Sequence, residues 1–155
     1  MPDEMKSKLL LLNGPNLNML GRRDPHHYGT FTLKTAENLV CETAAPFGFS
    51  VDCFQTNHEG QMIEKIHEAL DLYDGILINP GAWTHTSYAL RDALELTGLP
   101  ILEIHISDIN QREPFRRISV IRDVCIGQVA GLGLESYRVA TEQLCHYLEK
   151  RRDQA

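Results

Sequence analysis

Short apolar runs alternate along the chain with longer stretches in which apolar residues recur at helical spacing. A short, continuous apolar run that ends at Gly, Pro or Asn is typical of a strand buried on both faces of a parallel sheet. These runs predict five strands, at Lys8–Leu12, Phe49–Gln55, Gly75–Asn79, Ile101–Ile106 and Val124–Val129.

The stretches with helical spacing predict helices at Leu33–Phe47, around Met62–Tyr73, and at Tyr88–Leu96 and Glu135–Leu148. Thr and Ser side chains are favoured at helix N-caps, and Gly is favoured just past a helix end. Candidate caps are Thr32 or Thr35 for the first helix, Thr86 or Ser87 for the third, and Gly98 at the end of the third.

Strands that alternate with helices form right-handed βαβ units and a parallel sheet. We therefore expect an α/β protein, a three-layer αβα sandwich whose five-stranded parallel sheet has the flavodoxin-like order 2-1-3-4-5. The 155 residues suit a single catalytic domain, residues 1–155, with flexible tails at residues 1–7 and 149–155. In this fold, ligands bind beyond the carboxyl ends of the strands, at the switch point between strands 1 and 3.

Composition and charge narrow the class of protein. The formal net charge of −6 argues against a nucleic-acid partner. No apolar run approaches the ~20 residues of a membrane span, and the polar N-terminal residues do not look like a signal peptide. The cysteines have no metal-ligand spacing, so we expect no metal and place the protein in the reducing cytoplasm. They are Cys41, Cys53, Cys125 and Cys145.

Polar and titratable residues gather after three of the predicted strands. The loop after strand 1, residues 13–30, is longer than most connections, and loops of this length are more often functional than idle. The residues concerned are Asn16, Arg22, Arg23 and Tyr28 after strand 1, Asn79 to His85 after strand 3, and His105, Ser107, Asp108, Arg112, Arg116 and Arg117 after strand 4.

Two groups in this set are candidates for acid/base chemistry. A guanidinium beside a phenol favours the phenolate, so Tyr28 beside Arg23 is a candidate general base. Strand alternation places Glu103, His105 and Ser107 on one side, where a carboxylate can orient an imidazole that serves as a general acid. Each group also has a plain structural interpretation, as a solvated basic turn with a packing tyrosine, or as a satisfied histidine at a sheet edge.

The residues by themselves indicate an acid/base enzyme that acts on a small anion, and they do not identify the substrate. The turn before Tyr88 places helix amides where an anion could bind, although a capped βα turn looks the same. One alternative is a flavin- or nucleotide-binding module on the same fold, which would need a phosphate cradle rich in Ser, Thr and Gly after strand 1. Another is a scaffold without activity.

Three segments resemble the type II 3-dehydroquinate dehydratase family, and the similarity extends from about Lys8 to Leu148. They are Asn13-Gly14-Pro15-Asn16-Leu17-Asn18-Met19-Leu20-Gly21-Arg22-Arg23 with Tyr28-Gly29, then Asn79-Pro80-Gly81-Ala82-Trp83-Thr84-His85-Thr86-Ser87, and finally Glu103-Ile104-His105-Ile106-Ser107 with Arg112-Glu113-Pro114-Phe115-Arg116-Arg117. The resemblance implies a lyase that removes water from 3-dehydroquinate by anti elimination through an enolate, giving 3-dehydroshikimate in the shikimate pathway or in quinate catabolism.

The resemblance also implies a role for each matching residue. Tyr28 would take the proton beside the ketone, Arg23 would support the phenolate, and Asn16 would hold the enolate through a water. His105, oriented by Glu103, would protonate the leaving hydroxyl.

The substrate would be held by further residues of the same segments. Asn79 and the backbone amides of Ile106 and Ser107 would bind its carboxylate, and His85 and Arg116 would contact its ring hydroxyls.

Family members work without a cofactor and assemble as trimers that form a homododecamer. The resemblance therefore implies a homo-oligomer in which Asp92 reaches the site of a neighbouring subunit. It leaves open whether the role is biosynthetic or catabolic.

Overall fold

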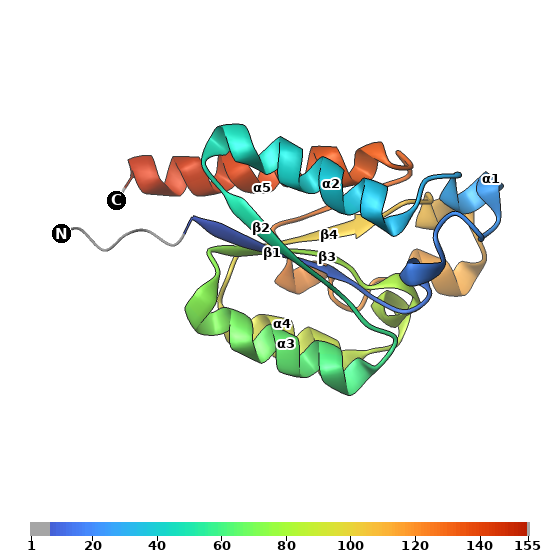
Figure 1. The fold of residues 1–155 in the computed structure, drawn as a ribbon. Helices are drawn as coiled ribbons and strands as arrows, with labels where there is room; N and C mark the ends of the chain where they lie inside the picture. Colours follow the sequence, from blue (N-terminus) through green and yellow to red (C-terminus); the bar gives the residue numbers. More distant parts are fainter. Residues whose placement is uncertain (1–6, 155) are drawn as a thin grey trace.

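The computed structural model describes residues 7–154 and is built on a five-stranded parallel sheet with the order β2-β1-β3-β4-β5 (Figure 1). The strands are β1 Lys8–Asn13, β2 Ser50–Gln55, β3 Gly75–Asn79, β4 Ile101–His105 and β5 Gly127–Ala130. The predicted flavodoxin-like order 2-1-3-4-5 is confirmed. Because β4 lies between β3 and β5, its residues belong to the interior of the sheet and not to its edge.

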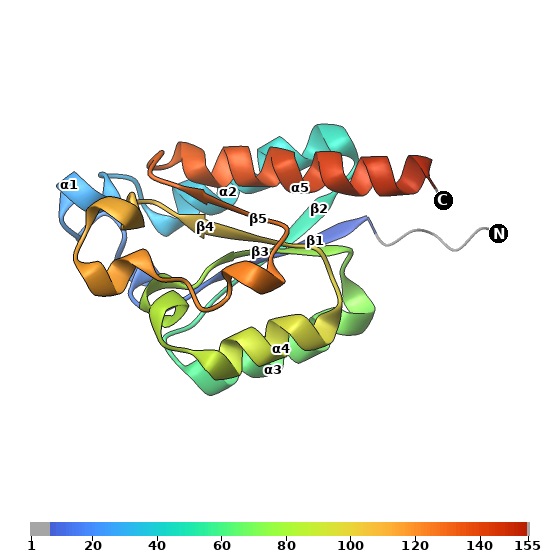
Figure 2. The same cartoon turned by 180° about the vertical axis from the view of Figure 1, so that it is seen from behind.

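Helices cover both faces of the sheet and complete the three layers. In Figures 1 and 2, α2 and α5 lie on one face, and α3 and α4 lie on the other. The helices are α1 Pro25–Tyr28, α2 Leu33–Ala44, α3 Glu59–Leu72, α4 Tyr88–Thr97 and α5 Glu135–Asp153. No helix within residues 7–154 combines the length and apolarity that a membrane crossing requires.

The alternation of side chains along each strand divides the core in two. Leu9 and Leu11 of β1 pack toward α2 and α5, whereas Leu10 and Leu12 pack toward α3 and α4. All four side chains are fully buried. A strand with helices on both faces needs apolar residues at every position, which is why the sequence shows continuous runs and not alternation.

Helix caps settle the two choices that the sequence left open. Thr32 is the N-cap of α2, where its hydroxyl accepts from the amide of Thr35. Ser87, and not Thr86, is the N-cap of α4, and its hydroxyl accepts from the amide of Leu90. Gly98 follows α4 with a φ of 65°, a conformation that glycine adopts without steric cost.

Two predicted element boundaries are wrong by three residues. The first predicted helix ends at Ala44, and residues 45–47 form a separate 3-10 turn that contains Pro46, whose ring is incompatible with a helix interior. The fifth strand begins at Gly127 and not at Val124, because Arg122–Val124 form a 3-10 turn. This strand starts where it begins to pair with β4, at Gly127, and an apolar run in the sequence does not show where that pairing begins.

The last helix is longer than the sequence indicated. It continues past Leu148 to Asp153, so the expected C-terminal tail from residue 149 is helical over most of its length. Arg152 explains part of this extension, since its guanidinium lies 4.6 Å from the Phe49 ring centroid and 3.9 Å from the Asp74 carboxylate. Residues 1–6, which hold most of the expected N-terminal tail, lie outside the described residues.

The carboxyl ends of all five strands point to the same end of the molecule. That end carries α1 and the loop after β1, opposite the start of β1 and the end of α5 (Figure 1). The candidate residues that follow β1, β3 and β4 are therefore brought together at the switch point, as parallel topology requires.

Candidate active site

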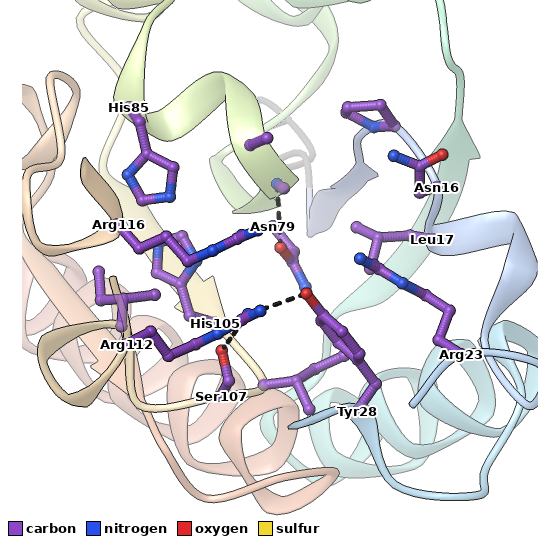
Figure 3. Close-up of a pocket in the computed structure, with 15 residues that line it drawn as sticks. Asn16, Leu17, Arg23, Tyr28, Asn79, His85, His105, Ser107, Arg112 and Arg116 are labelled. Atoms are coloured by element: carbon purple, nitrogen blue, oxygen red, sulfur yellow. Dashed lines mark hydrogen bonds between the residues drawn. The ribbon is translucent and has the colours of Figure 1, made fainter. Parts of the chain in front are cut away.

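A cavity of about 140 Å³ lies beyond the carboxyl ends of β1, β3 and β4 (Figure 3). For comparison, an engineered apolar cavity of roughly 150 Å³ holds one benzene ring. The cavity therefore suits a single small ring. Its lining comprises Pro15, Asn16, Leu17, Arg23, Tyr28, Asn79, Gly81, Ala82, His85, His105, Ile106, Ser107, Ile109, Arg112 and Arg116.

Tyr28 ends the one-turn helix α1, which Asp24 caps by accepting from the amide of His26. The guanidinium carbon of Arg23 lies 3.6 Å from the centroid of the tyrosine ring, so the two side chains stack. Figure 3 shows the Tyr28 hydroxyl directed toward Arg112, whose Nη1 donates to it over 2.8 Å. The pairing of Arg23 with Tyr28 thus exists in the folded protein, and a second guanidinium reaches the hydroxyl itself.

Arg112 is the site residue that sequence reasoning left without a role. Its side chain is 10% exposed, and Nη1 also donates to the Ser107 hydroxyl over 3.2 Å. Its Nε is buried and finds no acceptor among residues 7–154, although Glu113 lies 3.9 Å away. A buried guanidinium that is incompletely paired is available to an anion. The only signal in the sequence was its place among several arginines after the fourth strand.

The loop after β1 is held against the turn after β3 by close backbone contact. The amide of Gly14 donates to the carbonyl of Asn79 over 2.8 Å, and a Cβ on Gly14 would lie 2.5 Å from the Pro80 oxygen. Asn16 has a φ of 70°, which asparagine tolerates better than most residues, and its amide donates to Asn57 Oδ1 over 2.9 Å. Asn57 was not singled out from the sequence, yet it fixes the backbone of a predicted site residue.

His105 and Glu103 form a buried hydrogen-bonded pair at the end of β4. The His105 ring nitrogen Nε2 lies 2.5 Å from Glu103 Oε2, and both side chains are almost completely buried. Because a carboxylate can only accept, Nε2 carries a hydrogen and Nδ1 is the nitrogen available for proton exchange. Burial acts to raise the pKa of Glu103, but hydrogen bonds and the charge of His105 outweigh it, so this pKa lies below its ordinary value.

Asn79 is oriented by Tyr137 of α5, the helix that covers this face of the sheet. Its Nδ2 donates to the Tyr137 hydroxyl over 2.9 Å, and its Oδ1 accepts from the amide of Gly81 over 3.2 Å. The Tyr137 hydroxyl donates in turn to Asn13 Oδ1 over 2.7 Å. All three polar side chains are buried, so this chain of bonds determines how Asn79 faces the cavity.

His85 and Arg116 occupy the side of the cavity away from Tyr28 (Figure 3). Nδ1 of His85 lies 2.7 Å from the carbonyl of Ile118, so the neutral ring carries its hydrogen there and offers Nε2 as an acceptor. Burial lowers the pKa of His85, which favours this neutral form.

The remaining predicted residues divide between the cavity and the surface. Ile106 and Ser107 line the cavity directly after β4. Asp92 does not line it, because this residue is exposed on α4. Within the described part of the chain, no group of three or more His, Cys, Asp or Glu side chains is arranged to hold a metal ion.

The arrangement suits proton transfer to and from a small, ring-shaped anion. A phenol with two guanidinium groups offers a base, and an imidazole paired with a buried carboxylate offers an acid. The loop after β1 carries proline, leucine and arginine where a nucleotide-binding module would need a phosphate cradle, and the cavity suits one ring. We therefore class the protein as an acid/base enzyme on a flavodoxin-like α/β fold.

Comparison with known proteins narrows this class to one family. The family described as "Dehydroquinase class II" matches residues 7–145, and the chain belongs to it. A 3-dehydroquinate dehydratase of Anoxybacillus flavithermus is 51% identical over 142 residues, which cover 92% of this chain and 96% of that protein.

Solved structures agree with this assignment. The type II dehydroquinase of Butyrivibrio crossotus superposes with a TM-score of 0.85 at 47% identity, over 88% of this chain and 96% of that one. The type II dehydroquinase of Propionibacterium acnes gives a TM-score of 0.86 at 41% identity, over 90% and 97%. The family that the sequence motifs resembled is thus confirmed, and the nucleotide-binding alternative is not favoured.

Proposed function

We propose that the protein is a 3-dehydroquinate dehydratase, a hydro-lyase that converts 3-dehydroquinate to 3-dehydroshikimate and water in the shikimate pathway. The observation that carries the proposal is that one cavity, large enough for a single ring, is lined both by Tyr28 with its two arginines and by His105, which Glu103 orients. The family and its named members supply the substrate.

The reaction begins with loss of a proton from the carbon beside the substrate ketone. The Tyr28 phenolate takes this proton, and Arg23 and Arg112 stabilise the phenolate through the ring stack and the hydrogen bond at 2.8 Å. The electrons left on the carbon pass to the ketone oxygen, giving an enolate. Asn16 holds this oxyanion through a water, from a loop that Asn57 keeps in place.

Loss of hydroxide then completes the elimination. Hydroxide is a poor leaving group, so His105 donates a proton to it from Nδ1 while Nε2 stays bonded to Glu103. The enolate electrons form the new double bond as the C–O bond breaks. Tyr28 and His105 approach the cavity from different elements, α1 and β4, which suits an anti elimination.

The substrate is held by its carboxylate and its ring hydroxyls. Asn79, through the second hydrogen of Nδ2, and the backbone amides of Ile106 and Ser107 bind the carboxylate. His85 accepts from one ring hydroxyl through Nε2, and Arg116 donates to another. No step of this sequence uses a metal or an organic cofactor.

A second subunit completes the site in the assembly that we propose, a homododecamer of trimers. Tyr88, Asp92 and Leu96 are spaced along one exposed side of α4, and Tyr88 and Leu96 are 69% and 64% exposed. Ile118, which follows Arg116 and Arg117, is 63% exposed. Apolar side chains left in water around a carboxylate favour a second copy of the chain, whose site would receive Asp92.

A cytoplasmic location agrees with the state of the cysteines, which are free thiols at all four positions.

Ultraviolet absorbance during incubation with 3-dehydroquinate tests the activity, because the product contains a conjugated enone. We expect absorbance to rise in proportion to enzyme concentration, and mass spectrometry to show loss of one water. If neither change occurs with correctly folded protein, the proposed activity is wrong.

Subunit complementation tests the shared site. Tyr28→Phe and Asp92→Asn should each have low activity, while co-expressed mixed oligomers should recover activity in the fraction of sites that draw wild-type Tyr28 and Asp92 from different chains. Mixed oligomers that remain as inactive as either parent would exclude a contribution from the neighbouring subunit.

A further inference from the structure

The Glu103 carboxylate binds two hydroxyl groups in addition to His105. Glu103 Oε2 accepts from Thr84 Oγ1 over 2.5 Å, and Ser119 Oγ lies 2.8 Å from each carboxylate oxygen. The two hydroxyl oxygens are themselves 3.1 Å apart. Together with His105 at 2.5 Å, these groups surround a carboxylate that has no exposure to solvent.

Neither hydroxyl belongs to the cavity. Thr84 is fully buried in the turn after β3, and neither it nor Ser119 lines the cavity. The two residues are held together by the backbone, because the amide of Val120 donates to the carbonyl of Thr84 over 2.7 Å. Next to this contact, His85 Nδ1 bonds the carbonyl of Ile118 over 2.7 Å. The segment around Ser119 is thus fastened to the turn after β3 at two points.

A buried carboxylate needs such donors to remain ionised. Burial raises the pKa of Glu103 more than any other single cause, and it is opposed by His105 and then by the hydroxyls of Thr84 and Ser119. An ionised carboxylate is the form that accepts from Nε2 and so fixes the orientation of the His105 ring. A protonated Glu103 would lose this effect, since its hydrogen would compete for the same ring nitrogen.

We propose that Thr84 and Ser119 are positioning residues that act through Glu103 on the general acid His105. The inference rests on the proposed function, because it assigns His105 the task of protonating the leaving hydroxyl. The hydroxyls hold the carboxylate in one orientation and disperse its charge. The imidazolium is then aimed at the substrate and gives up its proton more readily than it would beside an unsupported carboxylate.

Other charged groups near this pair are the same in all the variants considered below. His85 and Arg116 face His105 from the turn after β3 and from the segment before Ile118, and both interact electrostatically with this part of the site. The Cys125 thiol also interacts electrostatically with Glu103, and burial raises its pKa, so it stays neutral.

The test compares the variants Ser119→Ala and Thr84→Val with the conservative variants Ser119→Thr and Thr84→Ser. Thr97→Val is the matched control, because the Thr97 hydroxyl is also buried and makes two hydrogen bonds, at the opposite end of α4. For each protein, kcat and KM for 3-dehydroquinate are measured as a function of pH, and thermal melting reports the folded fraction.

We expect Ser119→Ala and Thr84→Val to lower kcat by about tenfold, the effect of one charge-assisted hydrogen bond. KM should change little, since neither hydroxyl lines the cavity. The alkaline limb of the kcat profile should move upward by roughly half a pH unit or more, because a less stabilised carboxylate makes the pair hold its proton more tightly. The conservative variants should restore both values, and Thr97→Val should match the parent.

A merely structural role for these hydroxyls would reduce the folded fraction without moving the limb. An alkaline limb that stays in place, or that moves downward, overturns the proposal. If Thr84→Val does not fold, Ser119→Ala alone tests the proposal, because Ser119 is only half-buried. Failure of the proposed function is distinct from either outcome, because the parent protein itself would then release no dehydrated product.

Discussion

Replacing Tyr28 with phenylalanine removes one oxygen from the centre of the site and leaves the ring that stacks on Arg23. That oxygen is the proposed base and also the acceptor for Arg112 Nη1 at 2.8 Å. The same substitution therefore changes catalysis and the pairing of a nearly buried guanidinium, and the two effects have different sizes.

The catalytic effect should be the larger one. A positioned general base contributes roughly 10²–10⁴ in rate. Loss of Tyr28 as the base should thus raise the barrier by about 3–5 kcal/mol, at about 1.4 kcal/mol for each factor of ten. The effect should appear in kcat and in kcat/KM alike, because the transferred proton is shared only in the transition state.

The effect on stability should be smaller. Arg112 keeps its bond to the Ser107 hydroxyl at 3.2 Å and its ion pair with Glu113 at 3.9 Å. Loss of one hydrogen bond in this setting costs about 1 kcal/mol in the free energy of unfolding. For a domain of this size, that corresponds to a fall in Tm of about 2–4 °C.

Absorbance of the enone product measures turnover, and differential scanning fluorimetry measures Tm. Tyr147→Phe is a matched control, because it removes the same hydroxyl from a partly exposed tyrosine on α5, away from the site. A Tyr28→Phe enzyme that retains more than about one tenth of the parental kcat would refute Tyr28 as the base, since even the low end of general-base catalysis exceeds that loss.

Three further changes test interactions that support the site or the fold. Tyr137→Phe should lower the free energy of unfolding by about 1–3 kcal/mol in urea titrations, because the buried amides of Asn13 and Asn79 lose their shared partner; an unchanged midpoint would mean that another group pairs them. Gly14→Ala should lower Tm through the 2.5 Å approach of its Cβ to the Pro80 oxygen, whereas Gly60→Ala, with open space around it, should not. Equal Tm values for these two variants would contradict the close contact. The hydrogen bond from the Tyr73 hydroxyl lowers the pKa of Asp52 below its ordinary value of 3.8; burial opposes this effect, and the charge of Lys8 adds to it. The ionised Asp52 carboxylate therefore stabilises the fold above pH 3.8, and this contribution is lost as the pH falls through the pKa that Asp52 has in the folded protein. Tyr73→Phe should reduce this pH dependence in acid titrations, and an identical acid limb would show that the bond contributes nothing.

The order of the strands and the main candidate catalytic residues could both be predicted from the sequence, and for the same reason. Continuous apolar runs report burial on both faces, and the right-handed connection rule leaves few ways to order such strands. Once the strands are parallel, residues that follow them must meet at one end. Tyr28, Arg23 and His105 were predicted to share a site on this basis, and they line one cavity.

The ends of helices and strands were harder to predict from the sequence, because they depend on contacts with distant parts of the chain. The apolar residues from Val124 suggested a strand three residues too early, since a strand starts where it pairs with β4. The charged end of α5 looked like a tail, yet Arg152 contacts Phe49 and Asp74 from distant parts of the chain. Neither contact leaves a periodic trace in the sequence.

Local pattern in this sequence determined which segments are buried, which ends carry polar chemistry, and so the fold and the class of reaction. Tertiary structure alone decided which polar atoms meet. Arg112 reaches the hydroxyl of Tyr28 across 84 positions, Tyr137 reaches Asn13 across 124, and Ser119 closes on Glu103 from a loop without regular pattern. Hydrophobic periodicity encodes the direction that a side chain faces, whereas a hydrogen bond depends on ångström-scale placement of two backbones, which only the packed molecule provides.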